Sequence, residues 1–331
     1  MNFWQKLKRP IIVLAPMADV TDAPFRRLFA KYGKPDVTWT EFVSADGLIM
    51  AHDDNFDDTG LSSKQKLLKD LEYTDAERPI VAQLFSGRPE MMKKAAELVQ
   101  SLGFDGIDIN MGCPDRSVEK QKSGASLIKN PELAKALVDA ARLGAPHLPI
   151  SVKTRIGYNK LEEMESWVSE ILSTKPATLT LHWRTRKEMS KVPAHWELAK
   201  KAVELRDKIS PETILLGNGD VNSIEKANQL VKETGVDGVM VGRGIFGNPW
   251  FFNREIIRDR DISLEERLKV LVEHTKLFCE ILPHKNFSIM KKHYKAYVEG
   301  FDGAKELRVK LMDAKDVKEV EEIVADYLKN V

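Results

Sequence analysis

The chain has 331 residues, with 51 Lys and Arg against 50 Asp and Glu, and 43% of its residues are hydrophobic. Its mean hydropathy is −0.33. These values exclude a disordered or collagen-like chain, and the formal net charge of +1 provides no global basic field, so that binding of nucleic acid would require a local charge asymmetry. The length predicts two domains, or one barrel of about 250 residues with an appendage.

Two features bear on the compartment of the protein. The two cysteines, Cys113 and Cys279, lie far apart and form no CxxC pair, so we expect no disulfide framework and no metal site, and a reducing cytoplasm fits best. Near the N-terminus, residues 11–15 form an apolar run after several basic residues, but Pro16 ends this run. It is too short for a signal peptide or a membrane span, and we expect no membrane association.

Short apolar runs rich in β-branched residues alternate with longer segments of helical spacing. The runs are residues 11–15, 37–43, 80–85, 106–110, 150–154, 178–182, 213–217 and 238–241. Apolar residues recur every three or four positions in residues 24–32, 90–102, 131–143, 161–172, 196–208 and 223–234. This alternation predicts an α/β fold, a (β/α)8 TIM barrel that occupies residues 1–255.

Polar or small residues stand at the ends of most of the predicted strands or directly after them. They are Pro16, Met17, Gln83, Asn110, Cys113, Lys153, His182, Asn218, Gly219, Asp220, Gly242 and Arg243. Turn chemistry explains the glycines and the proline, but it does not explain Gln83, Lys153 and His182. Because the carboxyl ends of the strands form the active-site face of a TIM barrel, we expect these residues to converge there.

The glycines near residue 242 invite two interpretations. Residues 242–247 match the dinucleotide pattern GxGxxG, but they follow the last predicted strand instead of opening a βαβ unit. A phosphate site built by the loops after the seventh and eighth strands fits this position better. Lys153 at a strand end also permits Schiff-base chemistry, which keeps an aldolase as an alternative.

Residues 256–331 carry no strand signal and predict a smaller all-helical C-terminal domain, with helices over 264–282, 289–300 and 316–328. Residues 291–310 hold six basic residues against three acidic ones, interleaved with aromatic side chains. This composition suits a phosphate-rich partner such as RNA, and a solvated helix face is the alternative.

Several motifs together resemble the tRNA-dihydrouridine synthase family over about residues 11 to 310. They are APMA at 15–18 with Thr21 and Asp22, NMGCP at 110–114, VKTR at 152–155, HWRTR at 182–186, GNGD at 217–220 and VGRG at 241–244. The resemblance implies an FMN-dependent barrel with a helical C-terminal domain. It implies reduction of the C5–C6 double bond of uridine in tRNA with NADPH as the reductant, and it requires no protein partner.

The resemblance also implies roles for individual residues. Cys113 would be the catalytic acid that protonates C5, since a thiol is protonated at neutral pH. FMN would be bound by Pro16, Met17, Gln83, Lys153, His182, Asn218, Gly219, Asp220, Gly242 and Arg243. The RNA would be contacted by Asn110, Arg184, Arg186, Lys291, Lys292 and Lys295.

Some positions depart from the family pattern. Trp183 stands where the family usually has glycine, Asp19 replaces a second glycine, and residues 187–193 lack the usual Tyr-Gly arrangement. Trp183 would either stack on a base or form a wall of the pocket. Two other functions stay open at this point, namely an FMN-dependent barrel oxidoreductase that acts on a small free substrate and an RNA-binding relative without catalysis.

Overall fold

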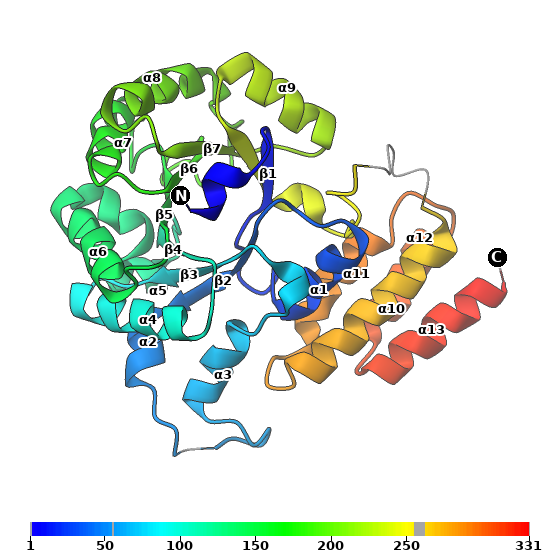
Figure 1. Ribbon diagram of the computed structural model, residues 1–331. Helices are drawn as coiled ribbons and strands as arrows, with labels where there is room; N and C mark the ends of the chain where they lie inside the picture. Colours follow the sequence, from blue (N-terminus) through cyan, green and yellow to red (C-terminus); the bar gives the residue numbers. More distant parts are fainter. Residues whose placement is uncertain (1, 55, 255–261, 331) are drawn as a thin grey trace.

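The computed structural model describes residues 2–54, 56–254 and 262–330. Eight parallel strands form a curled sheet with helices around it, and the C-terminal helices lie to one side (Figure 1). The strands are β1 (Ile11–Leu14), β2 (Thr38–Ser44), β3 (Ile80–Phe85), β4 (Gly106–Met111), β5 (Ile150–Arg155), β6 (Thr178–His182), β7 (Ile214–Asn218) and β8 (Gly238–Val241). The eight predicted strands are therefore all confirmed, with ends that differ by one or two residues.

The sheet closes into a barrel. Its strand order is β1-β8-β7-β6-β5-β4-β3-β2, so β1 and β2 are the two edges. Just before β2, the Leu14 N–H donates to the Val37 carbonyl at 3.3 Å and the Asp36 N–H donates to the Ile12 carbonyl at 3.0 Å. These bonds join the two edges, and the predicted TIM barrel is confirmed.

The helices that cover the barrel follow the predicted periodicity. They are α1 (Ala23–Tyr32), α4 (Pro89–Ser101), α6 (Pro131–Gly144), α7 (Met164–Ser173), α8 (Ala199–Ile209) and α9 (Ile224–Thr234). Local chemistry sets their ends: the Asp22 carboxylate accepts from the Phe25 N–H at 3.1 Å at the start of α1, and Gly235, at a φ of +80°, ends α9. Three short helices, α2 (Ala45–Met50), α3 (Ser63–Asp70) and α5 (Arg116–Lys120), were not predicted, because so few turns give little periodicity.

The C-terminal part contains α10 (Leu264–Ile281), α11 (Lys291–Tyr297), α12 (Ala304–Asp313) and α13 (Val317–Lys329). The helix predicted over 289–300 is confirmed as α11, but it is shorter than predicted. A 3-10 turn, Phe287–Met290, starts where the Asn286 side chain accepts from the Ser288 N–H at 2.8 Å, and α11 ends before Gly300. Helix α12 was also missed by the sequence analysis.

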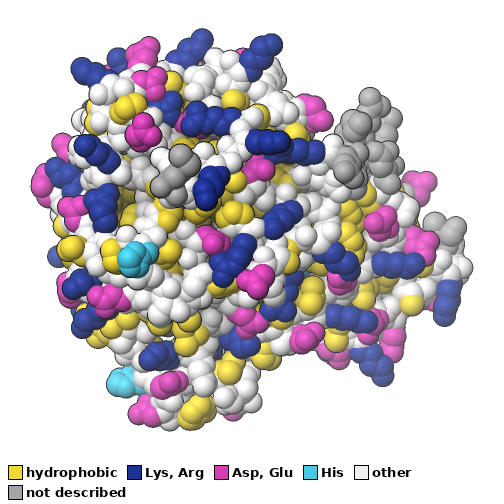
Figure 2. All heavy atoms as spheres, in the orientation of Figure 1, with side chains coloured by type: hydrophobic (Ala, Val, Ile, Leu, Met, Phe, Trp, Pro, Cys, Tyr) yellow, Lys and Arg dark blue, Asp and Glu magenta, His cyan; other side chains and the backbone are white. Residues whose placement is uncertain are grey.

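The barrel and the C-terminal helices share one hydrophobic cluster. Phe25 and Phe29 of α1 pack with Leu271 and Phe278 of α10 and with Tyr294 of α11, and all five side chains are buried. The expected domain boundary at residues 255 and 256 lies outside the described residues, and the division into two domains stays a prediction. Figure 2 shows basic and acidic side chains interspersed on the face turned to the viewer. In the described part of the chain, no helix is long and apolar enough to span a membrane.

Candidate active site

A cavity of about 560 Å³ lies at the carboxyl ends of the strands. Nine of the predicted cofactor residues line it, namely Pro16, Met17, Lys153, His182, Asn218, Gly219, Asp220, Gly242 and Arg243. Strand register explains the convergence: Arg155 of β5 pairs with His182 of β6, and His182 pairs with Asn218 of β7. The structure thus brings together residues that are spread over more than two hundred positions in the sequence.

Lys153 is a partly buried cation that lines this cavity. Its Nζ donates to Asn218 Oδ1 at 3.4 Å, and Asn218 Nδ2 in turn donates to the Met240 carbonyl at 2.8 Å. Burial, together with the nearby Arg155 guanidinium, lowers the pKa of Lys153 to about 8. The lysine is therefore protonated at neutral pH, and an anionic ligand in the cavity would stabilise its charge.

His182 is held in the neutral state. Burial and the surrounding cations Arg155, Lys153 and Arg184 lower the pKa of His182 well below its usual value. Arg184 Nη1 lies 3.1 Å from His182 Nε2. Because a guanidinium only donates, Nε2 accepts and the ring proton is on Nδ1, which makes Nδ1 a hydrogen-bond donor.

The loops after β7 and β8 form a cradle of backbone groups at one end of the cavity. Gly219 has a φ of +132° and Asp220 a φ of +54°. A Cβ at Gly244 would lie 2.5 Å from the Val221 carbonyl oxygen, so a side chain there would force the two loops apart. The Arg243 guanidinium reaches Asp220 Oδ1 at 3.1 Å and keeps 63% of its side chain exposed. Backbone N–H groups beside a guanidinium suit a phosphate group.

Gln83 and Asn110 lie in a buried chain of hydrogen bonds that supports Cys113. Gln83 Nε2 donates to Asp108 Oδ2 at 2.6 Å, and Asn110 Nδ2 donates to Gln83 Oε1 at 3.1 Å. Asn110 Oδ1 accepts from the N–H groups of Gly112 at 3.1 Å and Cys113 at 2.9 Å. The structure therefore does not place Gln83 in the wall of the cavity, and the Asn110 amide is used within the protein.

The Cys113 thiol lies in a turn at the end of β4 and is partly buried. Burial is the main cause that raises the pKa of Cys113, and the Lys153 and Arg155 cations oppose that shift only weakly. The thiol is therefore protonated at neutral pH and can act as an acid. Cys279, in α10, packs against the hydrophobic cluster and has the surroundings of a structural residue.

Comparisons with known proteins agree with this geometry. The model of the dihydrouridine synthase family matches residues 13–331. A probable tRNA-dihydrouridine synthase 2 of Bacillus subtilis is 40% identical over 98% of this chain and 96% of the relative. A probable tRNA-dihydrouridine synthase of Staphylococcus aureus is 38% identical over 98% of this chain and 95% of the relative.

The chain belongs to the dihydrouridine synthase family. It is accordingly an enzyme, a flavin-dependent oxidoreductase. Among solved structures, histamine dehydrogenase from Rhizobium sp. 4-9 matches with a TM-score of 0.53 at 13% identity, over 80% of this chain and 48% of that structure. This likeness concerns the barrel fold alone.

This member of the family holds its two predicted RNA-binding arginines in ion pairs. Arg184 is buried, pairs with Asp220 and donates from Nε to the Val192 carbonyl at 2.6 Å. Arg186 Nε lies 3.1 Å from both carboxylate oxygens of Glu119. The structure therefore places Arg184 in the wall of the cavity, whereas Arg186 does not line the cavity and is paired with a carboxylate.

Sequence reasoning missed the role of Arg155. This buried side chain donates to the carbonyls of Gly112 at 2.9 Å, Thr185 at 3.1 Å and Met189 at 2.8 Å. It thus ties the loop of Cys113 to the loop after β6. The available signal was an arginine at the end of a buried strand, within the VKTR motif of the family.

Trp183 is fully buried and packs on Trp196, with ring centroids 5.6 Å apart. A Cβ at Gly217 would lie 2.4 Å from the Trp196 ring and 2.8 Å from Trp183 Nε1, so the absence of a side chain at Gly217 makes room for both rings. Trp183 is therefore part of the packing behind the cavity and does not offer its ring to a base.

The three lysines predicted to bind RNA differ in their surroundings. Lys291 Nζ donates to the Met312 carbonyl at 2.5 Å, and Lys292 is half-buried beside Asp19, Asp22 and Glu41. Lys295 is exposed. Further exposed cations, which the sequence analysis did not select, lie on the loops after β4 and β6 and form no ion pair within the described ranges: Arg116, Lys120, Lys122, Lys187 and Lys191.

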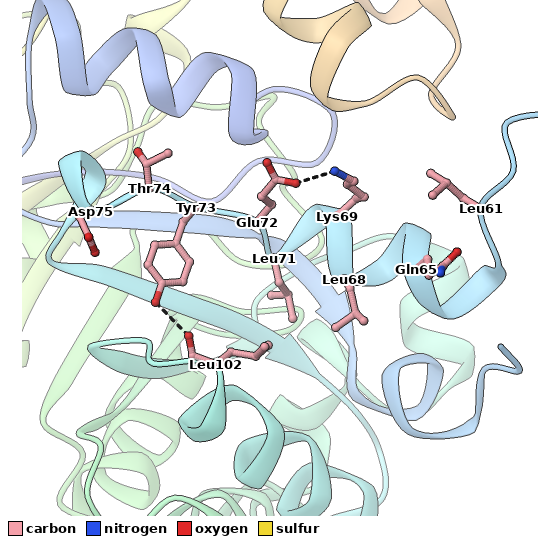
Figure 3. Close-up of a pocket in the computed structure, with 10 residues that line it drawn as sticks. All are labelled: Leu61, Gln65, Leu68, Lys69, Leu71, Glu72, Tyr73, Thr74, Asp75 and Leu102. Carbon is pink, nitrogen blue, oxygen red and sulfur yellow. Dashed lines mark hydrogen bonds and ion pairs between the residues drawn. The ribbon is translucent and has the colours of Figure 1, made fainter.

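A second cavity, of about 750 Å³, lies between α3 and the segment that leads to β3 (Figure 3). Leu61, Leu68 and Leu71 line it, and the Tyr73 hydroxyl donates to the Leu102 carbonyl at 3.0 Å at one side. None of the residues predicted for catalysis lines this cavity. Among the described residues, no group of three or more His, Cys, Asp or Glu side chains could hold a metal ion.

Proposed function

We propose that this enzyme reduces the C5–C6 double bond of uridine in tRNA to 5,6-dihydrouridine, with FMN as the bound cofactor and NADPH as the reductant. The observation that carries the proposal is a partly buried thiol, Cys113, whose raised pKa keeps it protonated and which interacts electrostatically with Lys153, a cation that lines the cavity. The names of the relatives from Bacillus subtilis and Staphylococcus aureus support tRNA as the substrate. We accordingly propose a cytoplasmic location.

The residues present fit FMN. The cavity of about 560 Å³ has the size of a small-molecule site, and its cradle at Gly219, Gly242 and Arg243 suits a phosphate group. Pro16 and Met17 would pack against the flavin ring, while Lys153 and the Nδ1–H of His182 would bind its polar edge. Asn218 and Asp220 would contact the ribityl chain. Gln83 would contribute indirectly, because its Oε1 accepts a hydrogen bond from Asn110 Nδ2 and so orients the Asn110 amide.

When bound, reduced FMN supplies a hydride for C6 of the uracil ring. The protein supplies the proton. Cys113 Sγ holds it and delivers it to C5, and a raised thiol pKa keeps this proton in place across the neutral range. Asn110 and Arg155 hold the Cys113 turn on both sides through its backbone N–H groups and the Gly112 carbonyl.

The exposed cations support an RNA surface on both sides of the cavity. Lys120 and Lys122 follow β4, whereas Lys295 and Lys310 lie in the helical part, which packs on the β1 and β8 side of the barrel. In the strand order, β4 is opposite β8. An RNA that contacts both sets would therefore span the mouth of the barrel, where phosphate contacts position it and the uridine enters.

Two measurements test the proposed function. The purified protein should be yellow and should release FMN on denaturation, and tRNA from a deletion strain should lose dihydrouridine in mass-spectrometric nucleoside analysis. A colourless protein that binds tRNA would indicate the non-catalytic relative. A flavoprotein whose deletion leaves tRNA dihydrouridine unchanged would indicate a small free substrate.

A further inference from the structure

Lys285, in the turn after α10, contacts acidic residues from three elements of the barrel. Its Nζ lies 2.9 Å from Glu41 Oε2, 3.0 Å from Asp70 Oδ1 and 3.7 Å from Asp19 Oδ1. Glu41 belongs to β2, Asp70 ends α3, and Asp19 lies in the loop after β1. Only 12% of the Lys285 side chain is exposed, so this charge joins the helical part to the barrel away from bulk water.

Glu41 continues this connection into the loop that lines the cofactor cavity. Its Oε1 accepts from the Asp19 N–H at 2.5 Å. Asp19 has a φ of +53°, a left-handed conformation that is uncommon for a residue with a side chain, and the bond to Glu41 helps to hold it there. In the same loop the Met17 N–H donates to the Thr21 hydroxyl at 2.9 Å, and Met17 lines the cavity.

We propose that Lys285 is a positioning residue for the cofactor: by neutralising Glu41 it holds Asp19, and with it the loop of residues 16–22, in the conformation that binds FMN. This inference rests on the proposed function, because FMN is the ligand whose affinity it concerns. Lys285 itself lines neither the cavity nor the Cys113 turn.

Among the described residues, Lys285 is the cation that forms ion pairs with both Glu41 and Asp70. The titratable and charged groups that face the cluster are Asp19, Asp22, Arg26, Glu41, Asp70, His284, Lys285, Lys292 and His293. Arg26 is already paired with Glu77 at 2.8 Å, and Lys292 is half-buried without an ion pair among the described residues. Removal of the Lys285 charge would leave Glu41 and Asp70 close together and without a cation between them.

The direction of the pH effect follows from these charges. Burial and the Glu41 carboxylate raise the pKa of Asp22 to about 7, and burial also raises the pKa of Glu41. Without Lys285, the acids repel one another when ionised and are relieved when protonated. The loop should therefore be most disturbed at high pH and least disturbed at low pH.

The test uses Lys285→Met, Lys285→Arg and the control Lys31→Met. Lys31 also joins the barrel to α10, through Glu273 at 2.7 Å, but it is 57% exposed. The FMN Kd of each apoprotein is measured by flavin fluorescence from pH 6.0 to 8.5 and divided by the wild-type Kd at the same pH. For Lys285→Met we expect this ratio of Kd values to be about 5 or more at pH 8.5, a factor at the lower end of those typical for coupled sites. The ratio should fall toward one at pH 6.0. Lys285→Arg and Lys31→Met should stay near one throughout.

The double variant Lys285→Met with Glu41→Gln covers the case in which the single variant fails to fold. The introduced amide can still accept from the Asp19 N–H but adds no charge, so we expect the double variant to fold and to bind FMN with a ratio near one at every pH. A flat ratio for Lys285→Met, or a double variant that binds FMN as poorly as a folded Lys285→Met, would overturn the inference. If the double variant also fails to fold, Lys285 supports the fold as a whole and the inference is rejected. A wild-type protein that does not bind FMN would instead contradict the proposed function.

Discussion

Asn110 Oδ1 accepts a hydrogen bond from the backbone N–H of Cys113 at 2.9 Å. The two residues stand at the end of the same strand, and this bond turns the chain so that the thiol leaves β4 at the mouth of the barrel. The asparagine amide is also bonded to Gln83 at 3.1 Å. This second bond fixes the orientation of the amide, and in the proposed mechanism Asn110 would place the proton donor.

We therefore expect Asn110→Ala to slow uridine reduction even though the thiol is still present. The substitution removes the side-chain oxygen that accepts from the backbone N–H groups of Gly112 and Cys113. It should therefore lower the free energy of unfolding by about 1–3 kcal/mol. Asn110→Asp keeps the acceptor oxygen and should retain more of the rate. Single-turnover reduction of tRNA by prereduced enzyme measures the effect, and equal rates for Asn110→Ala and the wild type would show that the bond does not position the thiol.

Cys113→Ala should keep bound FMN and RNA affinity but lose most of the uridine reduction, because it removes only the proton donor. General acid catalysis contributes about 10²–10⁴-fold, and the loss in single-turnover rate should lie in that range. Cys279→Ala is the matched control, since it removes the other thiol, and it should react at the wild-type rate. An unchanged rate for Cys113→Ala would refute its assignment as the acid.

The charge of Lys153 should make FMN binding dependent on pH. Because burial lowers the pKa of Lys153 to about 8, the cation is present below that pH and is lost above it in the free protein. An anionic ligand favours the charged form, so the FMN affinity of the wild type should fall as the pH rises past about 8. Titrations of Lys153→Met with FMN should show weaker binding and a flatter pH profile. A parallel pH profile in this variant would assign the titration to another group.

The sequence predicted the barrel and the residues of its mouth because their patterns are local. Each strand is a short apolar run, and residues such as Lys153, His182 and Asn218 lie at the ends of those runs or directly after them. The fold alone therefore brings them together. What each side chain contacts depends on partners far along the chain. Gln83 carries the same sequence signal as Lys153, yet its neighbours Asp108 and Asn110 turn it into the interior.

The helical part was harder to predict for a related reason. Its basic stretch is visible in the sequence, but the sequence does not show that Lys291 bonds to the Met312 carbonyl or that Lys292 lies beside three carboxylates of the barrel. The Lys285 contacts join residues more than two hundred positions apart and leave no local pattern. Net charge over a segment therefore indicated an RNA surface without indicating which lysines remain available for it.

The last prediction concerns the RNA surface. Each phosphate that a cation neutralises releases condensed counterion, so tRNA binding should weaken steeply with salt. We expect two triple variants, Lys120→Gln with Lys122→Gln and Lys187→Gln at the mouth, and Lys295→Gln with Lys305→Gln and Lys310→Gln on the helical part, each to raise the Kd for a tRNA transcript. Each should also flatten the slope of the logarithm of the association constant against the logarithm of the salt concentration by about 0.7–0.9 per lost contact.

The control is a triple variant of exposed lysines on α8 and α9, Lys200→Gln with Lys208→Gln and Lys232→Gln. It makes the same change in net charge and should leave the slope nearly unchanged. All three should retain FMN, because none of these lysines lines the cavity. If the control flattens the slope as much as the other two, the RNA responds to net charge alone and the proposed surface is wrong. If only the helical variant has an effect, the RNA contacts one side and does not span the mouth of the barrel.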